Sequence, residues 1–192
     1  MALTISDASL ALSAKIVIAG AFGVGKTTFV AAISEIPIAG TEALMTVAAE
    51  PDDDVSLARG KTTTTVAMDF GRIAVDDGLT LYLFGTPGQD RFWFLWDDLA
   101  RGALAAIVLV DTRNLAASWP VIAYFERRGD IPFTVVVNLF DGRLTHELDE
   151  VRDALDLSPA IPLTAADARD RHDVLEALRA LIRHALNLLP SH

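Results

Sequence analysis

The sequence predicts an α/β fold built around a mostly parallel sheet with crossover helices. Along the chain, short apolar runs alternate with segments of helical periodicity. Two runs, 104–110 and 133–137, are continuous and rich in β-branched residues, as is typical of central strands covered on both faces. Near the beginning, a buried strand at 15–19 is joined by a glycine-rich loop to a helix at 28–33.

The remaining elements follow in order. A polar, acidic stretch covers 37–61, and 64–70 is expected to be the next strand. Asp76-Asp77-Gly78 is a hairpin signal, so the strand at 79–84 should run antiparallel to it. Helices are expected at 92–101, 117–128, 147–155 and 171–188, the last with one apolar face. With no internal repeat and no linker, residues 1–192 should form a single domain.

Composition narrows the class of protein. The net charge is −10 and no basic stripe is present, which disfavours nucleic acid and anionic membranes as partners. The absence of cysteine excludes disulfides and thiolate metal sites. The four histidines show no metal-ligand spacing. Without a signal peptide or an apolar run of ~20 residues, a cytoplasmic protein with no direct membrane anchor is expected.

The loop from 20 to 27 matches the phosphate-binding pattern G-x-x-x-x-G-K-[ST] at every fixed position. Its backbone N–H groups should form a nest for phosphates at the positive end of the following helix. Lys26 should reach the β- and γ-phosphates, and the Thr27 hydroxyl should ligate Mg²⁺. The alternative is a glycine turn with no ligand. The residues expected to contact the nucleotide here are Gly20, Phe22, Gly23, Val24, Gly25, Lys26, Thr27 and Thr28.

Two further segments fit the γ-phosphate end of a nucleotide. In the motif at 85–89 (GTPGQ), the Gly88 amide is placed to approach the γ-phosphate and Gln89 to orient an attacking water. The alternative is a Pro-Gly turn. Thr65 is the best candidate to contact both Mg²⁺ and the γ-phosphate, with Thr64 as a rival, although a run of threonines is also typical of a strand.

Two segments fit the base. In the motif at 138–141 (NLFD), an aspartate can accept hydrogen bonds from the ring N–H and the amine of guanine, which adenine does not offer in that arrangement. The alternative is an Asn/Asp turn at a strand end. The segment 163–166 (LTAA), expected after the sixth strand, can offer backbone amides. The residues expected to contact the base are Asn138, Leu139, Asp141, Thr164, Ala165 and Ala166.

Taken together, residues 65–70 (TVAMDF), 88–92 (GQDRF), 101–103 (RGA) and 108–111 (VLVD) resemble the switches and strands of Ras-like small GTPases. The resemblance covers about 14–188 and is closest to the bacterial MglA and conservon type, encoded beside Roadblock-domain proteins and sensor components. It implies a three-layer P-loop NTPase fold, the small GTPase fold, with a six-stranded sheet, one antiparallel strand and about five helices.

The resemblance also implies a function. The protein would be a GTP-binding switch with slow, Mg²⁺-dependent GTP hydrolysis. Its partners would be a Roadblock-domain dimer or components of a sensor complex, with the chain a monomer or part of a heteromer. It would lie in the cytoplasm or at the membrane through such a complex. Two alternatives stay open, a nucleotide-binding scaffold with little hydrolysis and an ATP-directed P-loop protein.

The chain departs from the family pattern at several positions. Gly85 stands where eukaryotic relatives have the aspartate that holds Mg²⁺ through water, and Asp69 and Asp111 are alternative substitutes. Leu139 replaces a lysine that usually covers the base. Phe22 replaces a glycine and would obstruct an arginine inserted by a partner.

Because Phe22 would obstruct an arginine from a partner, the catalytic group is expected to come from the chain itself. Arg59 is therefore the candidate internal arginine finger, with a solvated loop arginine as the alternative. The predicted catalytic residues are Gln89, Lys26 and Arg59.

The segment 92–96 (FWFLW) is unusually apolar for a switch region. At helical spacing Phe92, Leu95, Trp96 and Leu99 share one face and should pack on the sheet. Trp93 and Phe94 would then project and contact a Roadblock-type dimer or another effector. The alternative for these two residues is packing between helices.

Overall fold

A single seven-stranded sheet forms the centre of the computed structural model, which describes residues 12–47, 62–75 and 78–188. The strand order is β2-β3-β4-β1-β5-β6-β7. β3 runs antiparallel to both of its neighbours, and the other neighbouring pairs are parallel. The strands are β1 (Leu12–Gly20), β2 (Ala39–Val47), β3 (Thr62–Ala74), β4 (Leu79–Gly85), β5 (Ala105–Val110), β6 (Phe133–Asn138) and β7 (Leu163–Ala166).

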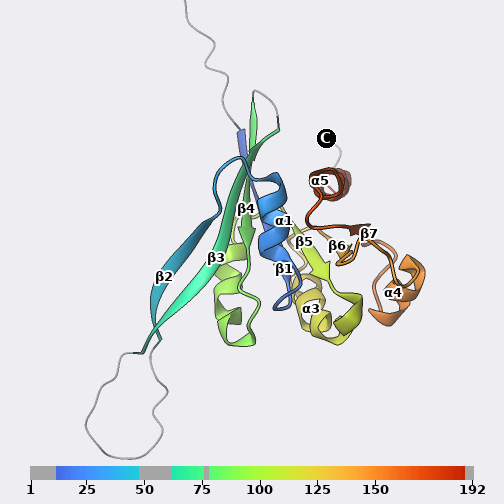
Figure 1. The fold of residues 1–192 in the computed structure, drawn as a ribbon, viewed down its shortest axis with the longest axis horizontal. Helices are drawn as coiled ribbons and strands as arrows, with labels where there is room; N and C mark the ends of the chain where they lie inside the picture. The colour runs from blue at the N-terminus through green and yellow to red at the C-terminus, as the bar shows by residue number, and fades with distance from the viewer. Residues whose placement is uncertain (1–11, 48–61, 76–77, 189–192) are drawn as a thin grey trace, which may run out of the picture.

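The α/β class and the one antiparallel strand are confirmed, and the sheet contains one strand more than the six predicted. The additional strand, β2, lies within the polar, acidic stretch 37–61, where no strand was predicted. Among the described strands β2 pairs with β3 alone, at the edge of the sheet. Its residues 39–47 (AGTEALMTV) do not alternate regularly between apolar and polar types, so the sequence carries little strand signal there. In Figure 1, β2 and β3 extend as a two-stranded ribbon away from the helices.

Five α-helices and two 3₁₀-helices accompany the strands in the described part of the chain. They are α1 (Lys26–Ile33), η1 (Asp90–Leu95), α2 (Trp96–Ala100), η2 (Thr112–Ser118), α3 (Trp119–Arg128), α4 (Leu148–Ala154) and α5 (Arg171–Asn187). None of the helices in the described part of the chain is both long and apolar enough to cross a membrane.

The helix expected at 92–101 is divided into η1 and α2. A 3₁₀-helix has three residues per turn, so Phe92 and Leu95 lie on the same side of η1. Both side chains are buried there and pack against Met68 of β3. The tighter helix is therefore explained by a contact with a strand that is distant in the sequence.

The sheet is the middle of three layers, as predicted. On β1, Ile16 and Ile18 face α1 and α5, whereas Val17 and Ala19 face α2, α3 and α4. This is the two-residue alternation of a strand buried on both faces. The apolar face predicted for the last helix is buried in α5. Arg171 also joins the two helices of its layer, because its Nη1 donates to the carbonyls of Ala32 and Ile33 at the end of α1.

Trp96 is the centre of an aromatic cluster beneath α2. It is 1% exposed, its ring stacks on Trp93 at a centroid distance of 4.9 Å, and its Nε1 donates to the carbonyl of Pro87 at 3.2 Å. The prediction that Trp93 projects from the protein is therefore wrong, because this ring is committed to stacking. Phe94 does project, with 53% of its surface exposed.

The two neighbouring aromatic residues should respond differently to truncation. Trp96→Ala removes a fully buried ring and should lower the free energy of unfolding by about 3–5 kcal/mol. Phe94→Ala, the matched control, should lower it by less than about 1 kcal/mol. Urea denaturation followed by circular dichroism measures both. Equal losses in the two variants would contradict this packing.

Candidate nucleotide-binding site

The predicted phosphate loop lies between β1 and α1, at the edge of the sheet where the parallel strands end. Open α/β sheets bind their ligands at this edge. A cavity of 490 Å³ opens there between the loop, the end of β4 and residue 69 of β3. It is lined by Phe22, Gly23, Gly25, Lys26, Thr27, Thr28, Asp69, Thr86, Pro87, Gly88, Gln89, Arg91 and Phe92.

Gly25 shapes the end of the loop. It adopts a φ of 102° and precedes the first residue of α1, where it provides no side chain to cap the helix. A Cβ at this position would lie 2.5 Å from Nδ2 of Asn138, so the contact with Asn138 also requires glycine. The first N–H groups of a helix have no partner within the helix, and here the residues that carry them, Lys26, Thr27 and Thr28, line the cavity. This arrangement is suited to binding an anion.

Lys26 is held beside the same loop. Its Nζ donates to the carbonyl oxygens of Gly20 at 2.8 Å and Ala21 at 2.7 Å, which occupy two of its three N–H groups. Burial lowers the pKa of Lys26 to about 8, and the nearby carboxylate of Asp69 opposes this shift. A Cβ added at Gly88 would lie 2.7 Å from Nζ. Because residue 88 is glycine, the motif at 85–89 can lie this close to the ammonium group.

Thr27 contacts Asp69, one of the two carboxylates that the sequence offered for the metal site. Its hydroxyl donates to Oδ2 of Asp69 at 2.7 Å. Of the two carboxylates considered as substitutes at the metal site, Asp69 therefore reaches the phosphate loop. Asp111 instead accepts hydrogen bonds from the backbone and side chain of Arg113, which lower the pKa of its carboxyl group.

Asn138 joins the phosphate loop to the segment that follows β7. Its Nδ2 donates to the carbonyl of Val24 at 2.9 Å, and its Oδ1 accepts from the backbone N–H of Ala168 at 3.1 Å. The side chain is 7% exposed. Both ends of the amide are thus used to hold two loops in place.

A second cavity, of 420 Å³, lies beside Asn138. The guanidinium of Arg113 stacks over the ring of Phe140 at 3.6 Å on its wall. Leu139, expected to cover a base, is partly buried against the core formed with α3 and α4, and the neighbouring Phe140 lines the cavity. The lining residues are Asp111, Thr112, Arg113, Asn138, Phe140, Asp141, Arg143 and Thr145.

The prediction for the segment 163–166 is corrected by its position in the sheet. Thr164, Ala165 and Ala166 lie within β7 rather than in a loop after it, and their backbone pairs with β6. The carbonyl of Ala166, for example, accepts from the N–H of Leu139 at 2.9 Å. The loop that reaches Asn138 starts one residue later, at Asp167. The short apolar pattern gave no signal for the end of this strand.

Three predicted catalytic and metal residues remain, namely Gln89, Thr65 and Arg59. Gln89 is exposed at the rim of the phosphate-side cavity, directly before η1. Thr65 lies on β3, where its backbone is opposite Leu44 of β2, and its rival Thr64 is opposite Met45. Arg59 lies outside the described residues.

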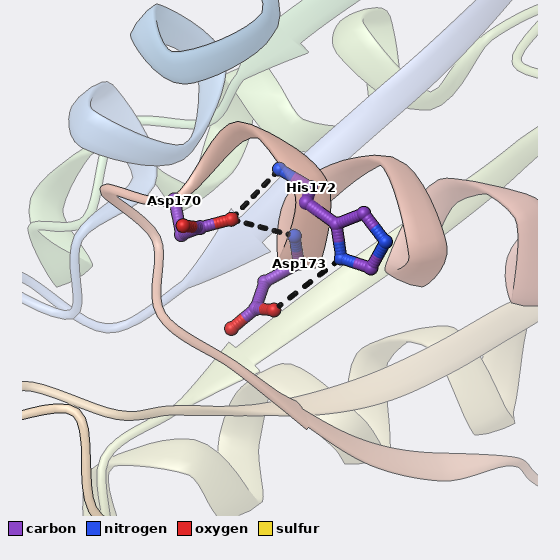
Figure 2. Close-up of side chains that lie close together, drawn as sticks. All are labelled: Asp170, His172 and Asp173. Carbon is purple, nitrogen blue, oxygen red and sulfur yellow. Dashed lines mark hydrogen bonds and ion pairs between the residues drawn. The ribbon is translucent and has the colours of Figure 1, made fainter.

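Asp170, His172 and Asp173 bring their potential ligand atoms within 4.8 Å of one another at the start of α5 (Figure 2). The carboxylates have structural partners here. Asp170 accepts from the backbone N–H groups of His172 at 2.8 Å and Asp173 at 3.1 Å, and Asp173 accepts from the N–H of Asp167 at 3.0 Å. This is a helix N-cap, and it fixes the loop that also donates to Asn138.

Comparison with known proteins identifies the family of the chain. Residues 18–188 match the model of a family described as conserved hypothetical ATP-binding proteins. The chain belongs to this family. Together with the phosphate loop and its cavity, membership makes it a nucleotide-binding P-loop protein.

The individual relatives of the chain are distant from it in sequence. The chain is 28% identical over 128 residues to the uncharacterized protein MJ1339 of Methanocaldococcus jannaschii. The aligned region covers 66% of this chain and 70% of that protein. The cytosolic domain of the T. maritima FeoB iron transporter in its apo form aligns with a TM-score of 0.64 and 16% identity, over 94% of this chain and 66% of that one.

A second solved structure covers its counterpart more fully. The FeoB G-domain from Methanococcus jannaschii aligns with a TM-score of 0.59 and 14% identity, over 91% of this chain and 98% of that one. At such identities, the two structural matches establish a common fold and no more.

The lowered pKa of Lys26 predicts how phosphate binding depends on pH. Below a pH of about 8 the ammonium is charged and attracts phosphate, and above it the neutral amine does not. The affinity for GDP, measured by titration calorimetry, should therefore fall about tenfold between about pH 7 and about pH 9. In Lys26→Arg the cation persists over this range, so a weaker but pH-independent affinity is expected. The same slope in both proteins would contradict the assignment.

Proposed function

We propose that this protein is a guanine-nucleotide switch that hydrolyses GTP slowly with Mg²⁺. The observation that carries the proposal is the pair of hydrogen bonds made by Asn138. They join the phosphate loop to the segment after β7, and Asp141 lies on the wall of the adjoining cavity. The phosphate side and the proposed base side are thus neighbouring parts of one site.

Discrimination between bases is assigned to Asp141. An ionised carboxylate only accepts hydrogen bonds, and guanine offers a ring N–H and an amine side by side. Adenine presents no such pair of donors, so it would leave the carboxylate without partners. Pockets built around such hydrogen bonds select strongly between ligands. Arg113, stacked on Phe140, adds a flat cationic surface to the same cavity.

Hydrolysis is assigned to groups on the phosphate side. Lys26 and the N–H groups at the start of α1 stabilise negative charge on the phosphates, and Gln89 orients the attacking water. Mg²⁺, when bound, neutralises charge on the phosphate oxygens. The hydroxyl of Thr27 and the carboxylate of Asp69 are oxygen donors of the type that Mg²⁺ prefers, so these residues fit the ion. Thr65 is proposed as a further ligand.

The switch itself would act through the motif at 85–89. Gly88 lies beside Lys26, where a γ-phosphate would be sensed, and the carbonyl of the preceding Pro87 is bound by Trp96. Loss of the γ-phosphate would change the order of this segment and, through Trp96, the packing of α2. Exposed Phe94 is then placed to contact a Roadblock-domain dimer or a sensor component that reads the state.

An ATP-directed protein is the second candidate, because the family is described as ATP-binding. Leu139 supports it as well, since it replaces the lysine usual in guanine sites. A scaffold with little hydrolysis is a variant of either candidate, supported by exposed Phe22 in the phosphate loop.

Competition between nucleotides separates the two candidates. GTP should displace a fluorescent GDP at least about 100-fold more effectively than ATP does, because Asp141 is satisfied only by guanine. Asp141→Ala should weaken GDP binding about tenfold or more and leave ADP binding unchanged. Tighter binding of ATP than of GTP would overturn guanine specificity and favour the second candidate.

Single-turnover hydrolysis tests the catalytic assignment. Gln89→Ala should slow cleavage of bound GTP by about 10²-fold or more, because the attacking water loses the group that orients it. Its affinity for GDP should stay within about twofold, since Gln89 is exposed at the rim of the cavity. An unchanged rate in the variant contradicts the role of Gln89. No hydrolysis in the unmodified protein would favour the scaffold.

A further inference from the structure

We infer that Asp69, on the antiparallel strand β3, supplies the carboxylate of the Mg²⁺ site and takes over the position that Gly85 on β4 leaves without a side chain. The inference rests on the proposed function, in which a nucleotide binds with Mg²⁺. It goes further because it assigns the metal-site carboxylate to a different strand from the one in the resembling family.

The register of the sheet explains how one strand can replace the other. Asp69 and Gly85 are directly opposite each other in the β3–β4 pair. Residues paired in this way project from the same face of the sheet. A side chain at either position therefore reaches the same side of β4, beside the phosphate loop.

The two positions also compete for one space. A Cβ at Gly85 would lie 2.9 Å from both Cβ and Oδ2 of Asp69, which is closer than such atoms approach. The carboxylate of Asp69 thus occupies the volume into which a side chain at position 85 would extend. The glycine at 85 is what allows Asp69 its present conformation.

The contact with Thr27 gives this carboxylate its chemical role. The hydroxyl donates to Oδ2 of Asp69 at 2.7 Å. Since its proton is directed to the carboxylate, the oxygen lone pairs of Thr27 remain for a cation. Asp69 orients the ligand that the phosphate loop provides and adds a negative charge next to it. Both residues line the phosphate-side cavity.

Asp111, the rival, is engaged elsewhere. Its carboxylate forms an ion pair with Arg113 at 2.8 Å and accepts from the backbone N–H of the same residue. It lines the cavity on the base side, with Asn138 and Asp141, rather than the cavity around Lys26 and Thr27. Asp111→Asn is therefore a comparison variant that removes a carboxylate from the base side. Whatever its effect on the affinity for GDP, it should keep the dependence of GDP release on Mg²⁺.

The test measures how fast fluorescent GDP leaves the protein with Mg²⁺ and after chelation by EDTA. In the unmodified protein, chelation should speed release about tenfold or more. Asp69→Asn should lose most of this acceleration, because its Mg²⁺ affinity should be about 10- to 100-fold weaker. Binding of Mn²⁺ to the GDP complex, followed by electron paramagnetic resonance, gives a direct second readout.

A swap of the two residues provides rescue. In the double variant Asp69→Gly, Gly85→Asp the crowding at Gly85 is relieved, and one carboxylate is returned to the same face of the sheet. This protein should recover the acceleration by EDTA and the Mn²⁺ signal. Retained binding of GDP by Asp69→Asn would show that its loss of acceleration is not a failure to fold.

The outcomes separate this inference from the proposed function. If Asp69→Asn keeps the acceleration, or if Asp111→Asn loses it instead, the assignment is overturned while nucleotide binding stands. If the unmodified protein binds GDP but releases it at a rate independent of Mg²⁺, the assignment also falls. If it binds neither GDP nor ADP, the assignment and the proposed function fail together.

Discussion

The open end of α1 is the constraint on which the site depends. Its first N–H groups have no partners within the helix, and the preceding Gly25 has no side chain to offer them. Such groups are stable only if water or an anion reaches them, so the surrounding elements must hold the end in place and leave it accessible. β1 leads directly into the phosphate loop before this end, and Asn138 binds the loop through the carbonyl of Val24. Arg171 joins the other end of α1 to α5.

Asn138 connects this constraint to the second half of the sheet. A single buried amide satisfies one backbone group in the phosphate loop and one after β7. The cap at the start of α5 then stabilises that second loop, so a helix far away in sequence helps to position the phosphate loop. Buried amides with both ends bonded are costly to replace, because each loss leaves a backbone group unpaired.

The sequence was informative where a short segment determines its own structure. The phosphate loop was predicted correctly because strand, glycines, lysine and helix follow one another within a few residues. Two features depended on partners distant in sequence and were not predicted. β2 exists through pairing with β3, and the end of β7 is set by pairing with β6. The prediction for Trp93 failed although its partner Trp96 is three residues away, because it assumed α-helical spacing and residues 90–95 form a 3₁₀-helix. Asp69 was one of two alternatives until the strand register brought it to Thr27.

The crowding between positions 69 and 85 constrains how such proteins diverge. A side chain cannot be added at 85 while Asp69 keeps its place, since their Cβ atoms would be 2.9 Å apart. An ancestor could therefore move the acidic group between strands only through an intermediate with none, or with two that clash. Homologues with aspartate at the position of Gly85 should carry a small residue at that of Asp69, and this correlated pair would be visible in an alignment.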